Sequence, residues 1–168
     1  MQKFAHMHKY RKKTVPKIFF ETLFAILNYM PMPSIASIPQ ILELPKILDE
    51  RGNLSFLESQ VHVPFKIKRC YWIYDVPGGE FRGSHAFKEQ HELIIALSGS
   101  FDAVIHDGVT EKRFSLSRSY YGLYLPPLSW RQLDNFSTNS LALVLSSHFY
   151  DEEDYVWDFE DFLRVKQK

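Results

Sequence analysis

The stretch GGEFRGSHAFKEQHE, residues 78–92, places side chains at a spacing suited to metal binding or proton transfer. His85 and Phe87 are separated by one residue, and Glu92 follows Phe87 after four intervening residues. Alternate residues of a β-strand point to the same face, so His85 and Phe87 share a face, and a tight turn would return Glu92 toward them on the neighbouring strand. Histidine and glutamate can ligate a metal or move a proton, whereas phenylalanine can do neither.

This spacing resembles the metal motif of the cupins, in which a second histidine stands at the position of Phe87. The fourth cupin ligand comes from a later motif of glycine, proline and histidine, whose places are taken here by Gly122, Pro126 and Arg131. Arginine is permanently charged and has no lone pair for a metal. Only His85 and Glu92 remain as ligands, so we predict no metal and instead a barrel mouth suited to an anionic or sugar ligand.

The composition is that of one soluble globular domain. The chain has 168 residues, of which 45% are hydrophobic and 15% aromatic, enough for a substantial core. Its single cysteine, Cys70, excludes an intramolecular disulfide and a four-cysteine zinc site. We therefore expect a reducing, cytoplasmic location, with Cys70 as a small buried apolar residue.

The charge is balanced overall but unevenly distributed. Residues 1–17 carry six of the 20 basic residues and no acid, which leaves 14 basic residues against 20 acidic ones in the rest of the chain. Nucleic-acid binding draws on a basic face that displaces counterions. The acidic main body therefore predicts that nucleic acid is not the partner.

The basic start is followed by the apolar run IFFETLFAILNYM at residues 18–30. Three interpretations stay open: a helix beside the domain, an unstructured or wrongly assigned extension with the true start near Met30 or Met32, and a signal or membrane-surface segment. Glu21 interrupts the run, which is also shorter than the roughly 20 residues that span a bilayer. We treat residues 1–31 as an N-terminal extension and residues 32–168 as a single domain, and we expect no membrane partner.

Strand signals dominate the domain. Residues 32–50 are spaced by Pro33, Pro39 and Pro45, which favours an extended arm or an edge strand. Beyond Arg51, short runs rich in branched and aromatic residues alternate with turn signals, and Asp-Gly at 107–108 predicts a hairpin. Many short strands with regular turns predict an all-β sandwich or barrel.

The C-terminal stretch DEEDYVWDFEDFLRVK, residues 151–166, is the exception and predicts one helix packed outside the sheet. Asp151 can cap it, and acids crowd the first turn, where the helix dipole favours negative charge. Tyr155, Phe159 and Phe162 fall near one helical stripe.

Several segments in order resemble the nucleotide-sugar 3,4-ketoisomerases, the FdtA/QdtA-type cupins with a WxcM-like domain. These segments cover roughly residues 45–163 and are RGNLSFLE, VPFKIKRCYWIYDV, RGSHA, LIIALSGSFDAVI, SYYGLYLPPLSWRQLDNFS and YDEEDY. The resemblance implies a cupin-type double-stranded β-helix, or jelly-roll barrel, that is metal-free and usually a homodimer. It implies an isomerase, without a cofactor, that converts dTDP-4-keto-6-deoxyglucose to a dTDP-3-keto-6-deoxyhexose by enediol-type proton transfer between C3 and C4. Such an enzyme serves cytoplasmic deoxyaminosugar biosynthesis for surface polysaccharide.

The resemblance also assigns site residues. The family's first active-site histidine matches His85, and its adjacent arginine matches Arg82. Its second histidine matches Phe87, which cannot transfer a proton. Either His85 works alone on one face of the sugar, or Glu92 or His91 supplies the missing acid; the alternative function is a non-catalytic cupin that binds the nucleotide sugar.

The remaining candidates each keep two interpretations. Arg69 and Tyr71 share a strand face: Arg69 reaches a ligand phosphate or a carboxylate, and Tyr71 orients sugar hydroxyls or belongs to the core. Arg131 contacts the ligand or pairs with a carboxylate such as Glu92, and Arg51 contacts the pyrophosphate or stabilises a turn. The predicted catalytic residues are His85, Glu92 and Tyr71. The predicted substrate-binding residues are Arg82, Arg69, Arg51 and Arg131.

Overall fold

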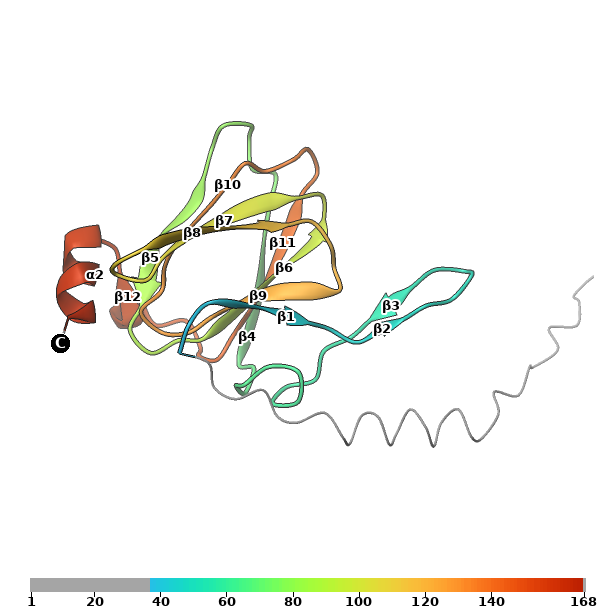
Figure 1. Ribbon diagram of the computed structural model, residues 1–168, viewed down its shortest axis with the longest axis horizontal. Coiled ribbons are helices and arrows are strands. Elements are labelled where there is room, and N and C mark those ends of the chain that lie inside the picture. Colours follow the sequence, from blue (N-terminus) through green and yellow to red (C-terminus); the bar gives the residue numbers. More distant parts are fainter. Residues whose placement is uncertain (1–36, 168) are drawn as a thin grey trace, which may run out of the picture. The chain divides into compact units, whose positions relative to one another are not determined.

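The structure is a computed structural model, and it describes residues 37–167. Within this range two five-stranded antiparallel sheets are formed (Figure 1). The first sheet has the order β1 (Gln40–Glu43), β9 (Tyr121–Leu125), β6 (Glu92–Ser98), β11 (Leu141–Ser146) and β4 (Arg69–Tyr74). The second has the order β12 (Tyr155–Val156), β5 (Arg82–Phe87), β10 (Trp130–Asp134), β7 (Phe101–His106) and β8 (Glu111–Leu116).

The main core lies between these two sheets. Its buried side chains come from both, among them Ile94 and Val144 of the first sheet and Phe101, Ile105 and Leu133 of the second. Alternation along β7, where every second residue is buried, shows how each strand places one face inward. The all-β architecture predicted from the sequence is confirmed.

A second core covers the outer face of the first sheet. Val63 and Phe65, which precede β4, pack on Leu93, Tyr124 and other residues of that face. Because this face is covered by chain, β6 is apolar on both sides and has buried residues from Glu92 to Ala96. Its ELIIALS sequence therefore lacks the alternation expected of a half-exposed strand.

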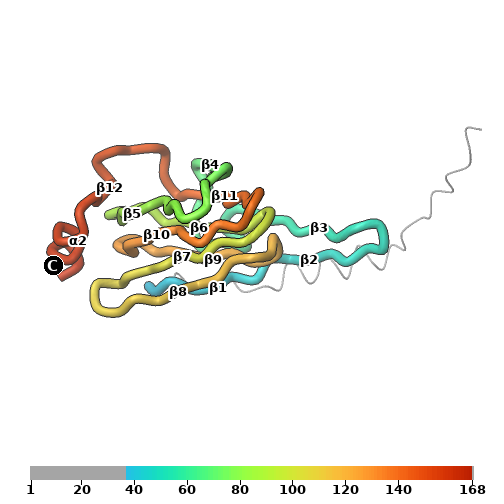
Figure 2. The backbone as a smooth tube through the Cα atoms, turned by 90° about the horizontal axis from the view of Figure 1, so that it is seen from above, coloured from blue at the N-terminus to red at the C-terminus, as the bar shows by residue number. Residues whose placement is uncertain are grey.

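Two local predictions for this part of the chain are confirmed. β1 is the edge strand expected from the proline-spaced segment, and it pairs with β9 alone. Asp107 and Gly108 connect β7 to β8, and Gly108 takes a φ of 101°, which glycine adopts without strain. A further hairpin, β2 (Lys46–Ile47) with β3 (Leu54–Ser55), extends from the barrel (Figure 2).

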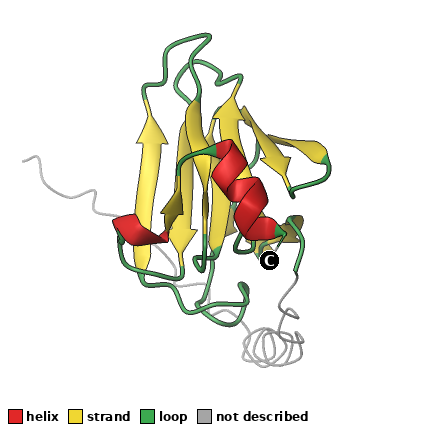
Figure 3. Cartoon of the chain, turned by 90° about the vertical axis from the view of Figure 1, so that its left-hand side faces the viewer, coloured by secondary structure: helices red, strands yellow, loops and turns green. Residues whose placement is uncertain are grey.

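The prediction of one helix over residues 151–166 is wrong in its extent. The structure has a short 3₁₀ turn, η1 (Glu152–Asp154), then β12, and then the helix α2 (Phe159–Lys166) (Figure 3). Asp151 caps η1 as expected, but Asp158 begins a second cap by accepting a hydrogen bond from the Asp161 backbone N–H. Tyr155 therefore lies in a strand, while Phe159 and Phe162 anchor α2 against Ala86 and Trp130.

The prediction that Cys70 is buried is also wrong, because Cys70 is exposed. Arg69, Tyr71 and Ile73 occupy the inward face of β4, so the alternation of the strand turns Cys70 outward.

The predictions for residues 1–31 lie outside the described residues. Within residues 37–167, no helix is long and apolar enough to cross a membrane.

Candidate active site

A cavity of about 170 Å³ lies between the two sheets at the end of the barrel where β6 begins and β5 ends. One sheet contributes strands β4, β6 and β11, and the other contributes β5, β10 and the segment from β12. Its polar lining residues are Tyr71, His85, Glu92, Arg131, Tyr155 and Trp157, and its apolar ones are Ile73, Ile94, Leu133 and Val144, with Gly83. The structure thus brings together four residues singled out from the sequence: Tyr71, His85, Glu92 and Arg131.

Glu92 and Arg131 form a buried ion pair that joins the two sheets. Arg131 Nη2 donates to Glu92 Oε2 over 2.6 Å, and the residues are 3% and 1% exposed. Glu92 Oε1 accepts from the Tyr71 hydroxyl at 2.6 Å and from Gln90 Nε2 at 2.9 Å. Both carboxylate oxygens are therefore occupied, as a buried carboxylate requires.

The prediction that Glu92 returns on the strand next to His85 is wrong in its geometry. β5 and β6 belong to different sheets, and Glu92 approaches from the opposite side of the barrel. Arg131, on β10 beside β5, spans the gap: its Nη1 donates to the His85 carbonyl oxygen over 3.3 Å while Nη2 reaches Glu92. Of the two interpretations of Arg131, the carboxylate pair is the one that this structure contains.

A β-bulge sets the position of His85. The pairing of β5 with β10 shifts register between Arg131 and Gln132, with Gly83 at φ 96° and Ser84 at φ 59°. A Cβ on Gly83 would lie 2.8 Å from the Arg131 carbonyl oxygen, so only glycine fits. Bulges commonly re-aim side chains beside active sites, and this one precedes the histidine directly.

The His85 imidazole is enclosed by aromatic rings. Its centroid lies 5.1 Å from that of Phe87, 4.9 Å from Tyr155 and 5.0 Å from Trp157. Both ring nitrogens are buried without a hydrogen-bond partner among the described residues. Burial, and secondarily the Arg131 charge, lowers the pKa of His85 to about 3, although the backbone of Gly83 opposes this shift. At neutral pH His85 is therefore a neutral imidazole able to accept a proton.

Tyr71 faces the same cavity from β4 and retains its phenolic proton. Burial and the nearby Glu92 charge raise the pKa of Tyr71 well above its ordinary value, because both disfavour the phenolate. Its hydroxyl donates to Glu92, which fixes the direction of that hydrogen bond.

Phe87 lies behind this constellation and does not line the cavity. Its buried ring stacks under the Arg131 guanidinium, 4.0 Å from the ring centroid, and meets the Tyr155 ring at 4.4 Å. Phe87 thus supports Arg131 by a cation–π contact. Among the described residues no group of three or more metal-ligating side chains is assembled.

The remaining predicted arginines are placed differently. Arg69 stacks on the Tyr71 ring at 5.1 Å and donates to Gln90 Oε1 over 3.2 Å, and its buried Nε has no hydrogen-bond partner. Arg82 is exposed at the start of β5, and the Arg51 side chain is 89% exposed in the β2–β3 turn, where it pairs with Asp49. Neither of these two lines the cavity.

His91, considered from the sequence as the missing acid, points away from the cavity. Its Nδ1 lies 2.7 Å from the Tyr124 hydroxyl, and its ring stacks with Phe65 on the outer face of the first sheet. Adjacent residues of a strand face opposite ways, so His91 and Glu92 belong to different surfaces.

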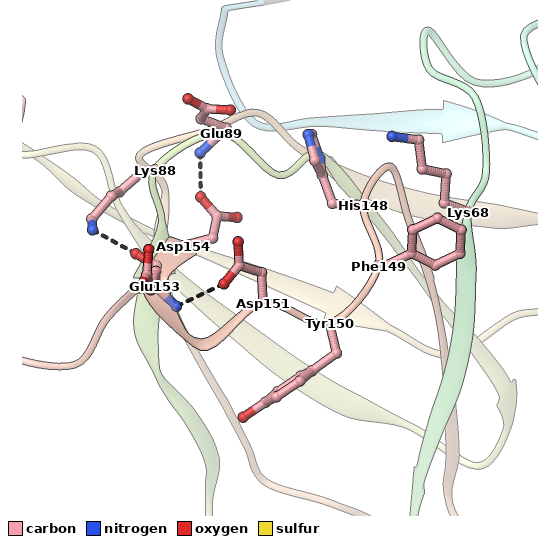
Figure 4. A pocket seen from close by; sticks show the side chains of 9 residues that line it. All are labelled: Lys68, Lys88, Glu89, His148, Phe149, Tyr150, Asp151, Glu153 and Asp154. Atoms are coloured by element: carbon pink, nitrogen blue, oxygen red, sulfur yellow. Dashed lines mark hydrogen bonds between the residues drawn. The ribbon is translucent and has the colours of Figure 1, made fainter.

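A larger cavity of about 440 Å³ lies nearby on the surface (Figure 4). Four acidic residues line it against Lys68 and Lys88. Two of the acids hold the backbone: Asp151 accepts from the Glu153 N–H at 3.0 Å, and Asp154 from the Glu89 N–H at 2.8 Å. These acids are engaged in structural hydrogen bonds, and the cavity contains none of the residues assigned to chemistry.

Three site residues were missed from the sequence: Gln90, Tyr155 and Trp157. Tyr155 and Trp157 were assigned to a helix, although their spacing of two and the capping pattern Asp158-x-x-Asp161 signalled a strand followed by a new helix start. Nothing in the sequence pointed to Gln90, because its role comes from hydrogen bonds with two residues, Arg69 and Glu92, that the fold brings to it.

Known proteins resemble this chain over more than three quarters of its length. A curated TDP-4-oxo-6-deoxy-α-D-glucose-3,4-oxoisomerase from Aneurinibacillus thermoaerophilus is 36% identical over 129 residues, which cover 77% of this chain and 93% of that protein. The crystal structure of a 3,4-ketoisomerase from Helicobacter canadensis matches with 39% identity and a TM-score of 0.75, covering 77% of this chain and 98% of the other. A mutant of the 3,4-ketoisomerase QdtA from Thermoanaerobacterium thermosaccharolyticum, in complex with TDP-4-keto-6-deoxyglucose, matches with 31% identity and a TM-score of 0.76, covering 79% and 96%.

These neighbours share the cupin-like barrel, so the fold class inferred from the sequence is confirmed. The family model described as FdtA, WxcM-like, C-terminal matches residues 38–167, most of the chain. The chain therefore belongs to the FdtA (WxcM-like, C-terminal) family.

Proposed function

We propose that this protein is a sugar 3,4-ketoisomerase that converts TDP-4-keto-6-deoxyglucose to a TDP-3-keto-6-deoxyhexose. The relatives with this named activity support the reaction and do not favour the non-catalytic alternative. The observation that carries the proposal is a neutral, buried His85 whose ring nitrogens lack partners, in a cavity that also presents the Tyr71 hydroxyl.

The chemistry requires a base, an acid and a place for negative charge. The base removes the proton from C3, and the C3–H electron pair forms a C3–C4 double bond while the C4 carbonyl oxygen becomes an enediolate oxygen. The base then returns this proton to C4, where the electron pair of the C3–C4 double bond forms the new C–H bond. The former C3 hydroxyl becomes the new carbonyl, and its proton passes to the C4 oxygen, which becomes a hydroxyl. Atoms and electrons balance within the sugar.

We assign proton removal at C3 to His85, because a neutral imidazole is available at neutral pH and its nitrogens have no competing partner. We assign to Tyr71 the orientation of a sugar hydroxyl, because its single phenolic proton is donated to Glu92 and its oxygen can still accept a hydrogen bond. Tyr71 is held by Glu92, whose other oxygen is engaged by Arg131. In this proposal Glu92 orients Tyr71, and the return of the proton to C4 falls to His85 on the same face.

Phe87 fits this division of roles. It lies beneath Arg131 and outside the cavity lining, so a proton carrier at that position would not face the reacting carbons. The geometry therefore supports an isomerase in which His85 moves the proton without a second histidine.

We further propose that the substrate diphosphate contacts Arg69. The buried Nε of its guanidinium has no hydrogen-bond acceptor, which is energetically unfavourable, and a phosphate oxygen would supply one. Arg82, Arg51 and Arg131 remain proposed substrate-binding residues; Arg131 lines the cavity, while Arg51 and Arg82 would have to reach a ligand extending beyond it.

The biological setting is proposed on the chemistry of the product. A 3-keto sugar is a substrate for transamination, so the reaction would supply a cytoplasmic aminotransferase in deoxyaminosugar and polysaccharide biosynthesis. A homodimer is supported by the β2–β3 hairpin, which exposes Leu48 and Leu54 and would be only marginally stable without a surface to pack on. Light scattering of wild type and of a Leu48→Asp/Leu54→Asp variant tests the dimer.

The test of the function is incubation with TDP-4-keto-6-deoxyglucose in heavy water, followed by NMR. We expect loss of the C3 proton signal and the appearance of a 3-keto species, both abolished in His85→Asn. Binding of the nucleotide sugar by a folded wild-type protein, without exchange or product, would reject the isomerase and leave a binding protein.

A further inference from the structure

Tyr155 and Trp157 form the outer wall of the cavity. β12 pairs with β5, and Val156, opposite Ala86, turns inward toward α2. Tyr155 and Trp157 therefore share the other face, and both line the cavity. Their rings are stacked with centroids 4.6 Å apart and planes inclined by 10°.

Trp157 is the least constrained part of this wall. β12 ends at Val156, and Asp158 is already the cap of α2, so Trp157 lies between the two elements. Its residue is 57% exposed, although tryptophan is usually well buried. Its indole combines an apolar ring with a polar N–H, a combination that is enriched at binding interfaces.

Trp157 is one of three aromatic rings packed around His85. Because the substrate must bring its C3 proton to a His85 nitrogen and both nitrogens are buried, at least one ring around His85 has to shift. Phe87 is buried under Arg131, and Tyr155 is paired with β5. Trp157 is neither buried nor paired with a strand, so it is the ring that can move.

The volume of the cavity limits which part of the substrate can bind beside Trp157. Pockets that enclose drug-sized ligands measure about 300–1,000 Å³, whereas this cavity measures about 170 Å³. It has room for one sugar ring but not for a whole nucleotide sugar. We therefore expect the cavity to take the hexose and the nucleoside diphosphate to lie outside its mouth.

We propose that Trp157 is a substrate-contacting residue whose indole moves off His85 on binding and packs against the 6-deoxyhexose ring. This inference rests on the proposed function. The C–H groups and the C6 methyl of a 6-deoxyhexose are apolar, and an aromatic face covers such a surface well. Ile73, Ile94, Leu133 and Val144 supply the apolar walls within.

A protein with Trp157 as its single tryptophan tests the contact directly. Trp72→Phe and Trp130→Phe together remove the other indoles, and fluorescence is titrated with TDP-4-keto-6-deoxyglucose and, separately, with TDP. We expect a shift or quenching with the sugar nucleotide and a clearly smaller change with TDP. Equal changes with both ligands would place Trp157 against the nucleotide, and no change with either would place it away from the ligand; both results overturn the proposal.

Kinetics provide the second measurement. Loss of an aromatic contact of this kind weakens binding by about tenfold, so we expect Trp157→Ala to raise KM by about that factor with a smaller effect on kcat, and Trp157→Phe to restore much of it. The matched control is Trp72→Ala, because Trp72 is 60% exposed and faces away from the cavity on β4. An unchanged KM in Trp157→Ala, with wild type turning over, overturns this inference alone. Absence of wild-type turnover rejects the isomerase, while the fluorescence titration still decides the contact.

Discussion

Removing either partner of the Glu92–Arg131 pair leaves the other as an unpaired charge inside a buried hydrogen-bond network. The two side chains are 2% and 4% exposed and meet at 2.6 Å. In Arg131→Met the Glu92 carboxylate keeps only its bonds from Tyr71 and Gln90. A buried charge left without its partner destabilises a protein by about 3–5 kcal/mol, so we expect that loss from Arg131→Met and a similar one from Glu92→Leu.

The double variant Glu92→Leu/Arg131→Met should be much less affected than the sum of the two. Replacing a whole buried ion pair by apolar residues of similar volume is often nearly neutral. Here the Tyr71 hydroxyl and the Gln90 amide lose their shared acceptor, and each unsatisfied buried donor costs about 1–3 kcal/mol. We expect a total loss of about 2–6 kcal/mol, below the roughly 6–10 kcal/mol of independent effects.

Equilibrium urea unfolding of the four proteins, followed by circular dichroism, measures these values. For a domain of this size each kcal/mol lowers Tm by roughly 3–6 °C, so thermal melts give a second reading. Where a single variant is too unstable to unfold reversibly, the comparison of its Tm with that of the double variant carries the test. Single variants that lose less than about 1 kcal/mol, or a double variant that equals the sum of the singles, would refute the reasoning.

Three further predictions follow from the same residues. Folding lowers the pKa of His85 to about 3, so the stability that depends on its neutral form is fully present above pH 6.5 and is lost as pH falls from 6.5 toward 3. Urea unfolding should therefore show that the wild type, relative to His85→Asn, loses about 1 kcal/mol of stability per pH unit in that window. Parallel pH dependence of the two proteins would contradict this prediction. Gly83→Ala should lower stability by about 2 kcal/mol and reduce kcat, because its φ is 96° and the added Cβ meets a backbone oxygen at 2.8 Å; thermal melts and turnover check this, and unchanged values would contradict it. Phe87→His should lower Tm without raising turnover, because the imidazole would replace the ring beneath Arg131; a clear gain in kcat would show that a second histidine does reach the sugar.

Much of the site could be predicted from the sequence. His85, Glu92 and Arg131 stood at positions whose spacing resembled a metal motif, and the arginine argued against metal. Tyr71 followed from the alternation of its strand. The first inference rested on a resemblance to a known motif, and the second on residue type and strand period; both are read from local sequence.

The sequence signals gave the wrong secondary structure where a helical pattern and a strand pattern overlap in the same residues. Residues 151–166 carry acids, a cap and an apolar stripe, all of which favour a helix, yet Tyr155 and Val156 gain more by pairing with β5. Such pairing depends on a strand distant in the sequence, and tertiary context then overrides helix propensity. Tyr155 and Trp157 were missed for that reason.

Taken alone, the sequence determined which side chains the protein has for chemistry and that its chain forms short strands, because both depend on residue type and spacing. Only the tertiary structure decided that Arg131 reaches Glu92 across the barrel, that Phe87 lies beneath Arg131, and that the His85 nitrogens are buried among aromatic rings. The physical reason is that strands from different sheets meet at a distance set by packing, and that distance determines which charges pair and which nitrogens stay without a partner.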